Sequence, residues 1–108
     1  MSETQFIVPL HGSPANRYRH RHTLEEGTVT GFVIQYEAEI EGEWREIVRY
    51  DTTHGSPHKD IMHPDGSETK EEFPHYTRAE VMTLGQNDIR KNWQKYREQY
   101  EREMRKLR

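Results

Sequence analysis

The chain has 108 residues, of which 31% are hydrophobic and 32% charged, and its formal net charge is −3. This length suits a single domain, because two halves of about 50 residues would each bury too little surface to be stable alone. The chain has no cysteine, which excludes disulfides, a thiolate nucleophile and cysteine-ligated zinc. It has neither a signal-peptide pattern nor an apolar run of roughly 18 residues, so we expect a cytoplasmic protein that does not enter a membrane.

The first part of the chain shows little regular patterning. Residues 1–27 contain a His-Gly-Ser-Pro segment at 11–14 and a basic run at 17–22, and we expect them to form an N-terminal extension and a loop. Residues 28–40 are different, because apolar and polar side chains alternate along them. This alternation predicts a strand with one buried face.

A second alternating segment, residues 44–52, follows a short Glu-Gly-Glu connection and predicts a hairpin. We expect Ile40 to pair with Trp44 across that connection. This register brings apolar side chains of the two strands together on one face, in the pairs Tyr36–Val48 and Ile34–Tyr50.

The next segments extend this hairpin into a meander. A polar loop at residues 53–57 precedes a predicted strand at 58–63, and the Pro-Asp-Gly sequence at 64–66 is a strong turn signal. A fourth strand is predicted at 67–73. The sequence therefore predicts a four-stranded antiparallel β-meander.

A long helix is predicted at residues 77–107. Thr77 and Glu80 have the spacing of a capping box, in which each side chain satisfies a free backbone N–H group of the first turn. Gly85 is expected to weaken or kink the helix. Apolar side chains recur at helical spacing and predict a stripe that covers the sheet, made of Met82, Ile89, Trp93, Tyr96, Tyr100, Met104 and Leu107. The predicted fold class is α+β.

The end of the predicted helix is basic. From Arg90 to Arg108 there are eight Lys or Arg residues and three Glu residues, a net charge of +5. Such a segment could contact nucleic acid or an acidic partner. Charged residues on a solvated helix face, paired at a spacing of four residues, explain it more simply.

The chemically richest segment is residues 49–66, which contain three of the seven histidines. A five-residue loop would pair Thr52 with His58 and Tyr50 with Asp60. Tyr50, His58 and Asp60 would then lie on the apolar face, where buried polar groups need hydrogen bonds and often mark a functional site.

Imidazole groups exchange protons near neutral pH, so His54 and His58 could act as general base and general acid in metal-free RNA cleavage. Arg49 or Lys59 could bind the phosphate. The candidate catalytic residues are therefore His54, His58, Tyr50 and Asp60, with no cofactor.

Two other interpretations of this segment stay open. In the first, the residues are structural, with Asp51 paired to Lys59 and Tyr50 to Asp60, while the histidines cap a loop. In the second they bind a metal ion, because imidazole and carboxylate groups recur at short spacings. The possible ligand sets are His54-x3-His58, His58-x-Asp60-x2-His63 and His20-x-His22.

From about Arg19 to Met104 the chain resembles a family of small prokaryotic proteins known only as a domain of unknown function. The matching features are His20-Arg21-His22, Arg49-Tyr50-Asp51-Thr52, His54-Gly55, His58-x-Asp60, Pro64-Asp65-Gly66, Asp88-Ile89, Asn92-Trp93 and Tyr96.

The segment is more distantly similar to the TumE-like toxins of toxin–antitoxin modules, whose pattern is Arg-Tyr-Asp-Asn, a glycine loop and His-Arg-His. Arg49, Tyr50, Asp51, Gly55 and His58 match this pattern. Three positions depart from it, namely Thr52, Lys59 and Asp60, which replace Asn, Arg and the second His, and the loop is one residue shorter.

These resemblances imply a toxin-like protein of a prokaryotic toxin–antitoxin or defence locus, and one that acts as a ribonuclease. Its expected partners are RNA and a cognate antitoxin or toxin protein. The alternative is a non-catalytic module that binds protein or nucleic acid. A homodimer is also expected, because so few apolar residues make a thin core that a second copy could extend.

Overall fold

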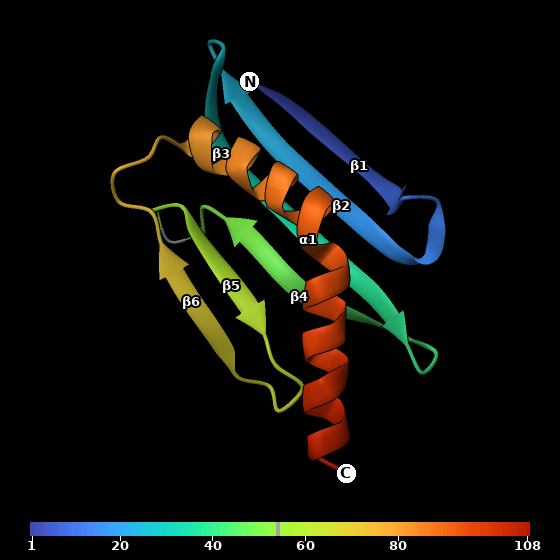
Figure 1. The fold of residues 1–108 in the computed structure, drawn as a ribbon. Helices are drawn as coiled ribbons and strands as arrows, with labels where there is room; N and C mark the ends of the chain where they lie inside the picture. The colour runs from blue at the N-terminus through green and yellow to red at the C-terminus, as the bar shows by residue number, and fades with distance from the viewer. Residues whose placement is uncertain (54) are drawn as a thin grey trace.

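The computed structural model describes residues 1–53 and 55–108. Across these residues the chain forms six strands and one helix: β1 (Ser2–Leu10), β2 (Ser13–Glu25), β3 (Thr28–Ile40), β4 (Glu43–Asp51), β5 (His58–Met62), β6 (Glu68–Glu72) and α1 (Arg78–Lys106). Each strand pairs antiparallel with the next, so β1 and β6 are the two edges of one sheet (Figure 1). The α+β class is confirmed, but the sheet has six strands and not four.

The two additional strands lie where the sequence predicted an extension and a loop. In β2 the strand alternation is present, but tyrosine and histidine occupy its inward positions, so that Tyr18 and His20 are 0% and 2% exposed. Arg19 and Arg21 point to the opposite face, as the register of β2 with β3 requires. The prediction was wrong because it treated these side chains as polar, although their rings and aliphatic stems cover sheet surface well.

The first predicted hairpin forms, and the pairs Tyr36–Val48 and Ile34–Tyr50 are confirmed. Its end differs from the prediction, because Ile40 pairs with Glu43 and Trp44 pairs with Glu39. The register shifts beyond Tyr36, which leaves Ile47 without a partner in the ladder. An extra residue of this kind moves the side chains that precede it in the strand to the opposite face of the sheet. Trp44, which was expected on the covered face, is therefore 39% exposed.

The pairing of β4 with β5 is shifted by one residue from the prediction. Asp51 pairs with His58, Tyr50 with Lys59, and Arg49 with Asp60. Because side chains alternate along a strand, a shift of one residue sends His58 and Asp60 to the face opposite Tyr50. The predicted pairs Thr52–His58 and Tyr50–Asp60 were therefore wrong.

The helix begins as predicted, since the Glu80 N–H donates to the Thr77 hydroxyl at 3.1 Å and the Thr77 N–H donates to the Glu80 carboxylate at 2.8 Å. The predicted apolar stripe is confirmed over most of its length. Ile89, Trp93 and Tyr100 are buried, and Met82, Tyr96 and Met104 are partly buried against the core. Leu107 lies beyond the helix and is 62% exposed.

Gly85 does not interrupt α1, which runs through it for 29 residues. A Cβ atom at Gly85 would lie 2.6 Å from Cδ1 of Ile34 and 2.7 Å from Cγ of Tyr50. The absent side chain thus lets the helix backbone approach the sheet closely at the position where Gly85 was expected to be a weak point.

The core lies between α1 and one face of the sheet. Figure 1 shows α1 lying across that face, and its contacts are with β3 and β4. The opposite side of the sheet, which we call the open face, carries no helix within the described residues. No helix in that part of the chain combines the length and apolarity needed to cross a membrane.

Candidate functional site

A compact group of ionisable side chains lies on the open face where β4 ends and β5 begins. Asp51 is the last residue of β4 and His58 is the first residue of β5, and the ladder places them opposite each other. Arg49 and Asp60 form the next pair on the same face. In the loop between the two strands, the Thr53 N–H donates to Oδ1 of Asp51 at 3.2 Å.

The centre of this group is the Asp51–His58–Asp60 cluster. Nε2 of His58 lies 2.7 Å from Oδ1 of Asp51 and 3.5 Å from Oδ2 of Asp60. The side chains are 4%, 8% and 1% exposed for Asp51, His58 and Asp60. Two carboxylates this deeply buried need compensating positive charge.

Arg49 supplies part of that charge. Its Nε lies 2.8 Å from Oδ2 of Asp51, its Nη2 lies 3.4 Å from Oδ2 of Asp60, and its Nη1 donates to Glu46 at 2.6 Å. Burial alone would lower the pKa of Arg49, but the charges of Glu46, Asp51 and Asp60 raise it. Burial also raises the pKa of Glu46. Arg49 therefore remains a fixed cation among three acidic residues.

The carboxylate of Asp60 has fewer hydrogen-bond partners than its buried position calls for. Oδ1 of Asp60 is buried and accepts no hydrogen bond from any residue that the structure describes. The nearest cation is the ammonium group of Lys70, with Nζ 3.3 Å away. A cavity of about 360 Å³ opens in front of the cluster, lined also by Val33, Gln35, Glu68 and Lys70.

The hydrogen bonds of His58 constrain its protons. Nδ1 lies 3.1 Å from the carbonyl oxygen of Ser56, and a carbonyl can only accept, so Nδ1 carries a hydrogen. Nε2 faces Asp51, which is also an acceptor. The separation of 2.7 Å between Nε2 and Oδ1 of Asp51 therefore requires a hydrogen or another cation between the two atoms.

Tyr50 and Lys59 were predicted to join this site, but they lie on the helix-covered face. The Tyr50 and Tyr96 hydroxyls each donate to Oδ2 of Asp88 at 2.6 Å, and Lys59 donates to the Tyr96 oxygen at 2.8 Å. Burial and the hydrogen bond to Asp88 raise the pKa of Tyr50 and of Tyr96. Burial would raise the pKa of Asp88 as well, but the hydrogen bonds from both tyrosines lower it. These hydrogen bonds connect α1 to β4 and β5.

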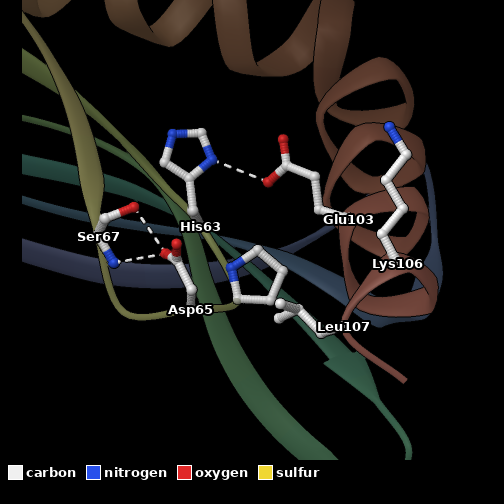
Figure 2. A pocket seen from close by; sticks show the side chains of 7 residues that line it. His63, Asp65, Ser67, Glu103, Lys106 and Leu107 are labelled. Atoms are coloured by element: carbon white, nitrogen blue, oxygen red, sulfur yellow. Dashed lines mark hydrogen bonds and ion pairs between the residues drawn. The ribbon is translucent and has the colours of Figure 1, made fainter.

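Among the described histidines, His63 does not join the ligand set that the sequence suggested with His58 and Asp60. His54 lies outside the described residues. His63 faces the C-terminal half of α1, where its Nδ1 lies 2.8 Å from Oε1 of Glu103 beside a cavity of about 390 Å³ (Figure 2). His20 and His22 are hydrogen-bonded directly to each other at 2.7 Å. His58 and Asp60 are therefore separated from His63 by the sheet.

The open face continues from the cluster into a row of arginines on β2. Nε of Arg17 and Nε of Arg19 donate to the two oxygens of Glu37 at 2.6 and 2.9 Å. The guanidinium of Arg17 also stacks 3.8 Å above the Trp44 ring. Burial raises the pKa of Glu37, but the hydrogen bonds from both arginines outweigh this and lower it. This part of the face is paired and ordered.

Asp51 is the functional candidate that the sequence did not identify as part of the site. Asp51 was matched to the family patterns and paired with Lys59, but it was not included among the candidate catalytic or phosphate-binding residues. Its position at the end of a strand, directly after the Arg-Tyr pair, was visible in the sequence, but its partner depended on a register that the loop length did not fix. Glu46 and Lys70 were also missed, because their positions depend on the irregular pairing of β4 with β3 and on the pairing of β6 with β5.

The structure defines a small α+β protein with a polar cluster on the open face of a β-meander. The chain belongs to the DUF7718 family, a domain of unknown function whose family model matches residues 1–106. No curated protein and no solved structure is similar enough to match it.

Proposed function

We propose that the chain is a toxin-like protein of a prokaryotic toxin–antitoxin or defence locus, and that it cleaves RNA at the Asp51–His58–Asp60 cluster. The observation that carries the proposal is the convergence of Arg49, Asp51 and His58 on one face. These three residues belong to the segment that resembles the TumE-like toxins. The resemblance alone would not require them to meet, and Tyr50 of the same segment does not join them.

The chemistry of the cluster suits a phosphodiester. Arg49 and Lys70 are cations beside a cavity wide enough for a phosphate group, and guanidinium groups bind phosphate oxygens through paired hydrogen bonds. In cleavage the RNA 2′-oxygen attacks phosphorus, its proton passes to a group of the site, and the bond to the 5′-oxygen breaks as that oxygen gains a proton. His58 and Asp60 are the groups placed to handle these protons.

A cleavage assay on purified protein tests the proposal. Labelled RNA should be cut by the parent chain, and His58→Gln should reduce the rate about 10²–10⁴-fold, the usual contribution of a proton-transfer group. His63→Gln is the matched control, because His63 also pairs with a carboxylate but lies on the other face. Equal rates for the parent and His58→Gln, or no cleavage by the parent, would refute the assignment.

One observation favours a second candidate function, a non-catalytic module that binds a protein partner or nucleic acid. Arg17 and Arg19 form ion pairs with Glu37, and Arg49 forms one with Asp51. Most of the positive charge of these three arginines on the open face is therefore neutralised within the chain. Expression separates the two functions. A toxin should arrest growth unless a neighbouring gene product, its antitoxin, is present, whereas a binding module should accumulate without harm.

A further inference from the structure

We propose that the Asp51–His58–Asp60 cluster is a binding site for one divalent transition-metal ion of the Mn²⁺ or Zn²⁺ class. The inference goes beyond the proposed function, because the ion site can exist whether or not RNA is the substrate. It rests on the donor atoms, the orientation of the imidazole and an unsatisfied buried oxygen.

The donor atoms are already gathered. One nitrogen of His58 and one oxygen from each of Asp51 and Asp60 all lie within 4.8 Å of one another, and all three residues are buried. Bonds of about 2.0–2.2 Å to one ion hold such donors roughly 3–3.5 Å apart. The separation of 3.5 Å between His58 and Asp60 fits this geometry, while the 2.7 Å between His58 and Asp51 must widen slightly.

The orientation of His58 is that of a ligand. Histidines that bind metals usually donate their other N–H to a carbonyl or carboxylate, which fixes the ring and directs the free lone pair at the ion. Nδ1 of His58 is 3.1 Å from the Ser56 carbonyl. Nε2 then faces two carboxylates with a lone pair, and a cation in the cluster removes the repulsion.

The carboxylates retain free oxygens for an ion. Arg49 approaches Oδ2 of Asp51 and leaves Oδ1 directed at His58. Oδ2 of Asp60, the oxygen that lies 3.5 Å from Nε2 of His58, is also 3.4 Å from Nη2 of Arg49. Oδ1, in a side chain that is 1% exposed, has no hydrogen bond within the described part of the chain and only the Lys70 ammonium nearby. An imidazole nitrogen combined with carboxylate oxygens favours Mn²⁺ or Zn²⁺ over Ca²⁺.

The cavity determines what the ion could do. Three protein ligands leave coordination positions free, and the open side of the cluster faces the cavity of about 360 Å³. This is the pattern of a catalytic ion, which keeps a position for water or substrate.

Binding of Mn²⁺ to the full chain tests the site directly. Paramagnetic Mn²⁺ should broaden the backbone NMR signals around residues 51, 58 and 60 at a stoichiometry of one ion. The broadening should weaken with distance from these residues, so that signals around His63 and Glu103, the other histidine–carboxylate pair, broaden less. Broadening centred elsewhere, or none at millimolar Mn²⁺, would overturn the proposal without the use of any variant.

Variants then assign the ligands. Removing a residue that hydrogen-bonds to a metal-binding side chain typically weakens metal affinity 10–100-fold. Removing a metal-binding side chain itself should cost more, so His58→Gln and Asp60→Asn should each weaken Mn²⁺ binding by at least about 100-fold. His63→Gln should bind as the parent does. Unchanged affinity in folded His58→Gln would contradict the site. RNA cleavage is measured separately, so an ion that binds without any cleavage would refute the proposed function while leaving the ion site intact.

Discussion

Replacing Gly85 by alanine should destabilise the protein, although alanine is the better helix former. The substitution gains about 1 kcal/mol of helix propensity. Against this, the new Cβ would lie 2.6 Å from Ile34 and 2.7 Å from Tyr50, whose side chains are 0% and 1% exposed. Overpacking of this kind costs about 1–3 kcal/mol and occasionally more. Tyr50 is also held by its hydrogen bond to Asp88, so we expect the upper end of this range, about 3 kcal/mol, and a net loss of about 2 kcal/mol.

Thermal and urea unfolding followed by circular dichroism measure this loss. A loss of about 2 kcal/mol corresponds to a fall in Tm of roughly 8–16 °C for a domain near this size. Gly31→Ala is the matched control, because a Cβ there meets only the Thr23 and Thr52 hydroxyls at an ordinary 3.4 Å. A Gly85→Ala variant at least as stable as the parent would show that helix and sheet do not approach as closely as described.

Three further predictions concern the helix-covered face. Trp93 is 8% exposed in the core, so Trp93→Ala should cost about 3–5 kcal/mol in urea unfolding, and a Tm close to that of the parent would contradict its core position. Burial, with His22 and Arg90, lowers the pKa of His20 from 6.5 to about 4. The unfolded chain then takes up the proton first, so stability present above pH 6.5 should decrease by roughly 1–3 kcal/mol as the pH falls to 4, a decrease that a His20→Gln variant should lack. Asp88→Asn removes the charged acceptor of two tyrosines and should cost about 1–3 kcal/mol, measured as a shift of the urea midpoint; an unchanged midpoint would show that the network does not fasten α1.

The sequence predicted the elements whose apolar residues have a clear period. The hairpin of β3 and β4 and the capped start of α1 were found in this way, because aliphatic and aromatic side chains there alternate or recur on one face. β1 and β2 were missed because burial in β2 is achieved by Tyr18 and His20, and edge strand β1 is exposed over almost its whole length. β2 is a strand because it pairs with β3, and β1 because it pairs with β2, and no local pattern in the sequence indicates either pairing.

The strand pairing predicted for the candidate site was wrong by one residue, which changes the partners of its side chains. His58, Asp60 and Arg49 do meet, yet Tyr50 and Lys59 face α1 and Asp51 takes their place. The whole difference follows from one residue of register across the loop after β4. Loop length and side-chain pattern allowed both registers, and the choice depends on packing that the segment alone does not contain.

We propose that RNA binds to the open face and not to the basic end of α1. NMR titration of the labelled protein with a short 2′-O-methyl RNA, which lacks the attacking hydroxyl, tests it most directly. We expect the signals that shift to belong to β4 and β5, around Arg49, Asp51, His58 and Asp60. Shifts confined to residues 90–108, or no shifts even at low salt, would contradict it.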